Sequence, residues 1–503
     1  MKSIKSATFD GIVDAIEVDV EGSFTKGLPS FSIGGLVTTA IQESRDRVKS
    51  ALLTNDYKFP PKKVIVNLSP SDIHKTGSHF DLSVALLIAL YEEKVDFKGF
   101  YIFGELGLDG ELKDTKSIFP LILSLANQVK NLKVIVPISS AQKVAMIPNV
   151  KVYALKNLSE SMEFFKFQNY EAKRVQNRTL EYKHFTFDKR SYFYLDKYPL
   201  DFKDVKGQKL AKYAALISAS GNHNVLYEGS PGCGKSMIIK RLQYIMPPMD
   251  MEAILEKAKL DSLEAKEPTF EPRRVFRNPH HSSTRASIFG GGSVNSKIGE
   301  VALANNGILF FDELPHFSKA ILEALREPLE DHSILISRVN SKVNYSTKFL
   351  FATALNPCPC GNLLSATREC RCSQMEVKRY KNKLSDPLLD RIDMFITMND
   401  SSFDDKSDVD SASMHELVLK TFKMQLQRGQ SCLNGKLNDD EIEKFCVLDS
   451  PSNDVLNQAV VNFSLSFRSI NKVLKVSRTI ADLDGSLNIQ KKHLLKALNY
   501  RKR

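Results

Sequence analysis

The stretch VLYEGSPGCGKS at residues 225–236, followed by the apolar pattern MIIKRLQYI at 237–245, identifies the central domain of this chain. An apolar strand, a loop of the form G-x-x-x-x-G-K-S and a helix, in that order, are typical of a phosphate-binding loop. Glycines let the backbone curl until its N–H groups face the phosphates, and the helix N-terminus adds a favourable dipole. We therefore expect ATP to be bound by the loop residues Gly229, Ser230, Pro231, Gly232, Cys233 and Gly234, by Lys235 at the β- and γ-phosphates, and by Ser236 through Mg²⁺.

A second stretch, GILFFDE at 307–313, predicts a buried strand that ends in two carboxylates. Asp312 is the candidate for the Mg²⁺ shell, and Glu313 is the candidate base that orients and deprotonates the attacking water. The alternative is an ordinary acidic turn after a buried strand. A phosphate-binding loop requires such a strand downstream, which favours the catalytic interpretation.

Two further residues are candidates for contact with the γ-phosphate. The run FLFAT at 349–353 leads to Asn356, where a neighbouring strand would end beside the nucleotide, although an asparagine is also common in turns. Arg391 lies in SDPLLDRID at 385–393, after the end of a predicted helix. An arginine supplied by a neighbouring subunit can raise the rate of phosphoryl transfer by a factor on the order of 10³–10⁵.

Composition and pattern indicate an α/β protein of several domains. The 503 residues are 42% hydrophobic and 26% charged, which is ordinary for globular proteins. We expect an α/β domain at 1–167, a surface linker at 168–200, a parallel-sheet ATPase core at 201–400 and a helical lid at 401–503. The chain has no apolar run of membrane-spanning length, and acidic residues occupy the region where a signal peptide would be apolar, so a cytoplasmic protein is expected.

Four of the seven cysteines form a cluster, Cys358-x-Cys360 and Cys370-x-Cys372, with nine residues between the pairs. Four thiolates suit tetrahedral Zn²⁺, whereas the tight C-x-C spacing also allows a redox-active cluster. Because Cys358 lies two residues from Asn356, we hypothesise that a metal-held knuckle at 358–372 fixes the loop that contacts the γ-phosphate.

Positive charge is the signal for a nucleic-acid partner. The net charge is +11, and residues 463–503 alone carry ten Lys or Arg against two Asp. Two inserts in the ATPase core qualify as channel loops, 282–299 with Lys297 and 334–348 with Arg338 and Lys342 at a predicted hairpin tip. Such cations bind phosphate without reading sequence, but a basic surface loop is an equally good explanation of any one of them. His280 and His281 have no assigned role.

The stretches GSPGCGKS, FRNPHHSSTRASIFGGGS, NNGILFFDELPHF, ALNPCPCG, PLLDRIDMF and FRSINKVLKVSRTIADLDG resemble the magnesium-chelatase-like AAA+ ATPases of the ComM/YifB family. The resemblance covers nearly the whole chain. It implies a hexameric DNA helicase that promotes branch migration during natural transformation. By the same resemblance Asn356 corresponds to sensor 1, Arg391 to the trans-acting finger and Arg468 to the sensor 2 arginine.

The N-terminal region resembles the Lon-protease-type domain of this family. The segment KTGSHFD at 75–81 lacks the Gly-Pro-Ser-Ala-Gly nucleophile setting of Lon, so we predict the fold without peptidase activity and a structural role for Ser78. The leading hypothesis is an ATP-driven motor that acts on branched or single-stranded DNA. A magnesium-chelatase motor subunit and a Lon-like protein unfoldase or protease are the alternatives.

Overall fold

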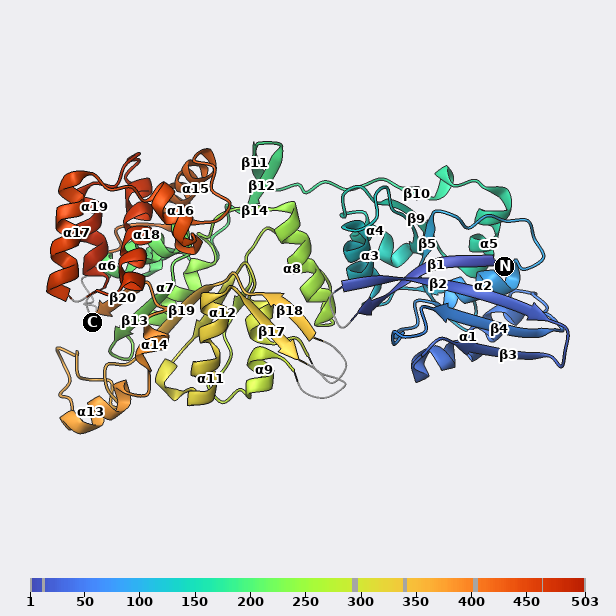
Figure 1. The fold of residues 1–503 in the computed structure, drawn as a ribbon, viewed down its shortest axis with the longest axis horizontal. Helices are drawn as coiled ribbons and strands as arrows, with labels where there is room; N and C mark the ends of the chain where they lie inside the picture. The colour runs from blue at the N-terminus through green and yellow to red at the C-terminus, as the bar shows by residue number, and fades with distance from the viewer. Residues whose placement is uncertain are drawn as a thin grey trace. The chain divides into compact units, whose positions relative to one another are not determined.

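The computed structural model describes residues 2–10, 14–291, 297–337, 342–400, 406–463 and 465–501, except for the side chains at positions 337 and 342. The chain is a mixed α/β protein that divides into two compact units, one built on the residues up to Glu181 with Leu255–Phe270, the other on most of the remainder (Figure 1). No helix in these described ranges is both long enough and apolar enough to cross a membrane.

The first unit is an eight-stranded mixed sheet with helices packed on it. Its strands, in spatial order, are β10 (Arg174–Val175), β9 (Lys151–Leu155), β8 (Lys133–Pro137), β5 (Phe100–Ile102), β1 (Lys2–Asp10), β2 (Asp14–Thr25), β4 (Lys63–Ser69) and β3 (Ser30–Gly34). Its helices are α1 (Thr39–Thr54), α2 (Asp81–Ala89), α3 (Ile118–Ala126), α4 (Ile138–Val144) and α5 (Leu158–Phe167). A short ribbon of β6 (Glu105–Leu106) and β7 (Leu112–Lys113) completes this unit.

The alternation of side chains along β4 shows how this sheet covers its core. Val64, Val66 and Leu68 are fully buried, while the residues between them are less so. This period of two places one face of the strand on the helices and the other toward the surface. Leu82 of α2 belongs to the same buried cluster.

The second unit is built on a five-stranded parallel sheet in the order β15 (Phe276–Arg277), β16 (Ile308–Phe311), β19 (Leu350–Leu355), β13 (Val225–Gly229) and β20 (Met394–Met398). Every residue of β16 and β19 is buried. Such continuous apolar runs are expected of parallel strands covered on both faces. Since all five strands run the same way, the loops after β13, β16 and β19 emerge at one edge of the sheet.

Helices α6 (Lys209–Gly221) and α7 (Lys235–Leu242) pack on this sheet. The same unit contains α9 (Arg285–Phe289), α10 (Glu300–Leu303), α11 (Lys319–Ala324), α12 (Arg326–Glu330), α13 (Gln374–Lys381) and α14 (Asp386–Leu389), whereas most of α8 (Met251–Leu263) belongs to the first unit. The C-terminal region is helical, with α15 (Ser411–Gln427), α16 (Asp439–Phe445), α17 (Ser450–Phe463), α18 (Phe467–Leu483) and α19 (Lys491–Asn499). Figure 1 shows these last helices, in orange and red, gathered beside α6. Val476 and Ile480 of α18 share one buried cluster with Ala214 of α6.

The segment expected to be an irregular linker contains a β-hairpin that was not predicted from the sequence. Strands β11 (Lys183–Phe187) and β12 (Arg190–Tyr194) pair antiparallel, and β14 (Met249–Asp250) adds a third strand. Asp188 and Lys189 form the two-residue turn, each with a positive φ. In the predicted channel hairpin, β17 (Ser333–Ser337) pairs with β18 (Lys342–Ser346), while the predicted tip lies outside the described residues.

Candidate active site

The glycine-rich loop joins β13 to α7, as its sequence predicts. Gly232 and Gly234 have φ of 87° and 98°, a conformation that favours glycine because it lacks a Cβ. Gly229 closes the strand against β20, since a Cβ there would lie 2.7 Å from the Met398 carbonyl oxygen. Burial raises the pKa of the Cys233 thiol, which favours its neutral form.

Lys235 is the first residue of α7, directly after the glycine-rich loop, and its ammonium group donates hydrogen bonds to oxygen atoms. The Nζ atom donates to the carbonyl oxygens of Gly229 at 2.6 Å and Ser230 at 2.9 Å, and to Oδ1 of Asn356 at 3.2 Å. The side chain is almost fully buried. A cation in this position is ready to transfer its hydrogen bonds to the phosphates of a nucleotide.

Ser236 contacts the first residue of the acidic pair. The Ser236 hydroxyl donates to Oδ2 of Asp312 at 3.0 Å, although the two residues are 76 positions apart. Glu313 is exposed and has a φ of 52°, unusual for a residue other than glycine, and its N–H donates to Oδ1 of Asp312 at 3.0 Å. The turn thus holds Asp312 toward the loop and leaves the Glu313 carboxylate accessible to solvent.

Asn356 reaches Lys235 because β19 lies between β13 and β16. The register pairs Glu228 of β13 with Leu355 of β19, so Asn356 directly follows the strand end beside the loop. The structure therefore brings together five of the residues predicted for the nucleotide site: Lys235, Ser236, Asp312, Glu313 and Asn356.

The donor set at this point fits magnesium. A serine hydroxyl and an aspartate carboxylate already in hydrogen-bonding contact offer two hard oxygen ligands, which is the chemistry that Mg²⁺ prefers beside phosphates. Ser236 and Asp312 would hold the ion. The bound ion would neutralise the charge that develops on the phosphates.

The two predicted arginines lie at the opposite end of the sheet. Asn224, the residue before β13, donates from Nδ2 to the Arg391 carbonyl oxygen at 2.9 Å, which places Arg391 where β13 begins and not where the nucleotide loop lies. The Arg391 guanidinium binds Glu330 and the Pro387 carbonyl oxygen. Arg468 binds the other oxygen of the same Glu330 carboxylate at 2.7 Å. One acid therefore holds both arginines, away from the loop of their own chain.

Glu330 was not predicted from the sequence. It lies at the end of α12 and lines an open cavity of about 770 Å³ together with Arg285, Phe289, Glu327 and Arg391. An acid at the end of a short helix has no distinctive local pattern. Its importance follows only from the tertiary placement of α12 beside Arg391 and Arg468.

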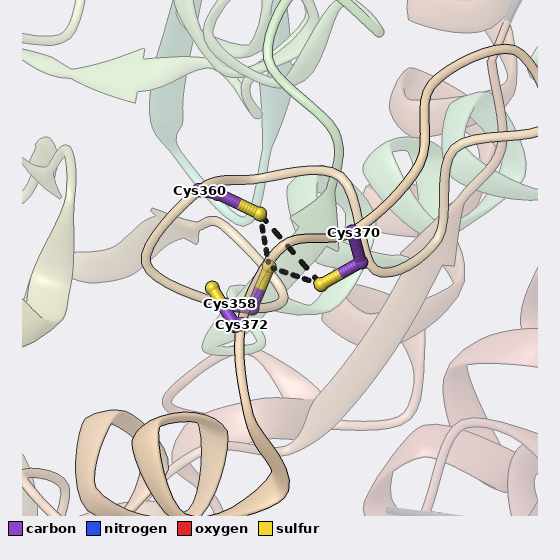
Figure 2. Close-up of side chains that lie close together, drawn as sticks. All are labelled: Cys358, Cys360, Cys370 and Cys372. Carbon is purple, nitrogen blue, oxygen red and sulfur yellow. Dashed lines mark hydrogen bonds between the residues drawn. The ribbon is translucent and has the colours of Figure 1, made fainter.

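The four clustered cysteines converge. Cys358, Cys360 and Cys370 have sulfur separations of 3.4, 3.7 and 3.6 Å, and the Sγ atoms of all four lie within 4.8 Å of one another. Figure 2 shows the four side chains brought together by two turns of one loop. The thiols are free and therefore available to a metal ion.

Among the predicted DNA contacts, Lys297 is exposed next to Ile298, which forms a β-bridge with Gly290. Arg338 lies outside the described residues, and Lys342 begins β18 with its side chain not described. The unassigned His280 and His281 have ring centroids 4.1 Å apart. DNA contact by these loops stays a prediction.

The predicted structural serine of the first unit contacts an acid. The Ser78 hydroxyl donates to the Glu105 carboxylate. The adjacent His79 is buried, with Nε2 at 2.8 Å from the Ala7 carbonyl oxygen and Nδ1 at 3.2 Å from the Ser117 hydroxyl. The absence of peptidase activity remains a prediction.

Comparison with known families matches the chain in three parts. Residues 201–406 match "Magnesium chelatase, subunit ChlI", residues 20–140 match "Subunit ChlI of Mg-chelatase", and residues 408–501 match "Magnesium chelatase, subunit ChlI C-terminal". The second of these covers most of the region predicted to resemble Lon.

Whole-length relatives include "Competence protein ComM" of Haemophilus influenzae, which is 37% identical over 97% of this chain and 95% of its own length. The YifB proteins of Salmonella typhimurium and Escherichia coli are 34% and 33% identical over the same shares of each chain. With these relatives and a nucleotide site assembled at the edge of a parallel sheet, the chain belongs to the ComM/YifB family of magnesium-chelatase-type AAA+ ATPases.

Proposed function

We propose that this protein is an ATP-hydrolysing subunit of a ring-shaped motor that acts on DNA and promotes branch migration, as in natural transformation and recombination. The observation that carries the ATPase part is the convergence of Lys235, Ser236, Asp312 and Asn356 at one sheet edge. The DNA part is supported by the whole-length similarity to a competence protein. We place the protein in the cytoplasm, where thiols such as the four clustered cysteines stay reduced.

Hydrolysis would use the chain's own residues in fixed positions. Lys235 exchanges its carbonyl partners for phosphate oxygens, while Asn356 orients the γ-phosphate from the adjacent strand end. Glu313 accepts the proton of the attacking water, for which its exposed carboxylate is suitably placed beside Asp312. The proposed cofactors are ATP with Mg²⁺ and, at the cysteine cluster, Zn²⁺.

The transition state would be completed by a neighbouring subunit. Arg391 and Arg468 lie at the end of the sheet far from their own loop, so we propose that they face the nucleotide of the next chain in a homo-hexamer. Arginine meets the charge that spreads over the phosphoryl oxygens. Lys297, Arg338 and Lys342 are the proposed DNA contacts within the ring.

The test compares wild type with Lys235→Ala and Glu313→Gln in ATPase and strand-exchange assays on duplex, forked and four-way DNA. We expect DNA to stimulate the wild-type ATPase, Lys235→Ala to lose nucleotide binding, and Glu313→Gln to bind ATP while turnover falls by about 10²-fold or more. Wild-type turnover that responds to no DNA structure would contradict a DNA motor, and stimulation by unfolded protein would favour the unfoldase.

A magnesium-chelatase motor subunit is the second candidate, because the matched families carry that description. Such a subunit would drive Mg²⁺ into a porphyrin and would require partner subunits. ATPase activity that responds to those partners but not to DNA would favour this alternative.

A further inference from the structure

The four clustered thiols have the spacing of a tetrahedral metal site. A zinc ion bound to four thiolates at about 2.3 Å has neighbouring sulfur atoms about 3.8 Å apart. The separations of 3.4, 3.7 and 3.6 Å among Cys358, Cys360 and Cys370 are close to that value, and Cys372 lies within 4.8 Å of all three. Sulfur atoms of a disulfide are about 2.05 Å apart, and paired disulfides would not require all four thiols to share one centre.

The loop that carries these thiols packs directly on the nucleotide loop. Gly361, one residue after Cys360, has a φ of 82°, and a Cβ on it would lie 2.6 Å from Cδ of Pro231. Pro231 is the third residue of the phosphate-binding loop. The cysteine loop therefore touches the phosphate-binding loop without room for even a methyl group between them.

A second attachment fixes the far side of the cysteine loop. Oδ2 of Asp400 accepts hydrogen bonds from the Ser365 hydroxyl at 2.7 Å and from the Ala366 N–H at 3.1 Å. Asp400 follows β20, whose last residue, Met398, pairs with Gly229 at the start of the phosphate-binding loop. The cysteine loop is thus tied to both sides of the nucleotide loop, and Asn356 leads into it.

We propose that Cys358, Cys360, Cys370 and Cys372 bind Zn²⁺ and that the metal-bound loop is a brace for the phosphate-binding loop. The metal holds Gly361 against Pro231 and fixes the start of the loop at Asn356. The brace deepens the proposed ATPase, because it acts on the same nucleotide site. Loss of the metal would release the contact and leave the loop free to move from the conformation that binds phosphate.

The first experiment measures zinc and nucleotide affinity together. Wild type should contain about one zinc ion per chain, and Cys370→Ser with Cys372→Ser should contain none and bind a fluorescent ATP analogue about tenfold more weakly. Cys432→Ser, a half-buried thiol in the C-terminal helical region, is the matched control and should change neither quantity. If the double variant does not fold, a chelator applied to wild type, followed by added Zn²⁺, should lower and then restore affinity.

The second experiment separates the brace from the metal. Gly361→Ala should keep its zinc but bind the analogue about tenfold more weakly, because the added methyl group overlaps Pro231. Gly99→Ala is the control: Gly99 has a φ of 81°, almost the same backbone conformation, but beyond its two chain neighbours no residue has an atom within 4 Å of the position of the new methyl group. The control should bind zinc and nucleotide as wild type does.

Two results would overturn the proposal. Purified protein that holds no zinc while all four thiols react freely would remove the metal site. Zinc removal, or Gly361→Ala, that leaves nucleotide affinity and turnover unchanged would remove the brace. Neither result depends on DNA. If zinc loss and Gly361→Ala leave nucleotide binding unchanged but DNA stimulates the ATPase, the brace is wrong and the proposed DNA motor stands. If both changes weaken nucleotide binding but DNA does not stimulate the ATPase, the brace stands and the DNA motor is wrong.

Discussion

The carboxylate of Glu330 forms ion pairs with two arginines. Its carboxylate binds Arg391 through one oxygen and Arg468 through the other. A bidentate acid between two cations reduces their mutual repulsion and limits the rotamers of both. Glu330 is therefore a positioning residue for the arginines that we propose to act on a neighbouring nucleotide.

Glu330→Gln should lower kcat of the assembled ATPase by about tenfold with little change in KM, because both arginines would lose their charged partner and their shared position. The comparison is a steady-state titration with ATP. Glu327→Gln is the matched control, since Glu327 lies one turn earlier in α12 and lines the same cavity. An equal loss in both variants would mean that α12 is simply destabilised by removing charge.

At the scale of elements, helix α18 joins the sheet through buried polar contacts. Lys472 lies 3.0 Å from the Asp393 carboxylate, and the Asn224 N–H donates to the same carboxylate at 2.7 Å. His223 is buried beside them and contacts the Thr479 hydroxyl of α18 at 2.7 Å. Burial, reinforced by nearby lysines, lowers the pKa of His223 to about 4.

This lowered pKa predicts the direction of a pH effect. The unfolded chain takes up a proton at His223 near its ordinary pKa of 6.5, whereas the folded chain does not until about pH 4. Stability from this group is therefore complete above 6.5 and is lost as the pH falls toward 4. In wild type, the free energy of unfolding should fall between about pH 7.5 and about pH 5.5. In His223→Asn this fall should be smaller by about 1 kcal/mol, as measured by urea unfolding at the two pH values. An unchanged pH dependence would contradict burial of this histidine in its neutral form.

The β17–β18 hairpin carries the next prediction. Arg338→Glu with Lys342→Glu should weaken DNA binding and reduce the slope of log K against log salt by about two, since each cation releases about one counterion. Binding titrations at several salt concentrations measure the slope. Lys420→Glu, at an exposed lysine of α15 outside both predicted channel loops, is the control. An unchanged slope would show that the hairpin does not touch the phosphates.

Local sequence could predict some of these elements and not others. The strand, glycine loop and helix at 225–245 are determined by residues adjacent in sequence, and Asn356 follows from the neighbouring parallel strand. The β11–β12 hairpin was missed because its turn is Asp188-Lys189, both with positive φ, and lacks the glycine that usually marks such a turn. The bridging role of Glu330 depends on contacts between distant segments, which no local pattern encodes.

In the whole molecule, Lys235 and Arg391 lie at opposite ends of the parallel sheet, so the proposed ATPase site would need residues from two subunits. We expect Arg391→Ala to bind ATP normally but to hydrolyse it about 10³-fold more slowly, and Lys235→Ala to bind none. If Arg391 acts on a neighbour, mixing the two inactive variants should restore a part of the activity, because some interfaces pair an intact loop with an intact arginine. ATPase rates at several mixing ratios test this. A mixture as inactive as its components would mean that Arg391 acts within its own chain.

The strand order has a consequence for assembly. In the proposed ring, nucleotide would bind at the carboxyl ends of the strands, while Arg391 and Arg468 lie at the amino ends. Each protomer would then offer a nucleotide site on one flank and arginines on the other. Such a head-to-tail interface uses two different surfaces of the protomer, so a ring built from it has a direction in which each subunit supplies arginines to the next. A single protomer that lacks both Lys235 and Arg391 would therefore inactivate two nucleotide sites. One is its own site, and the other is the site of the neighbour to which it supplies the arginine.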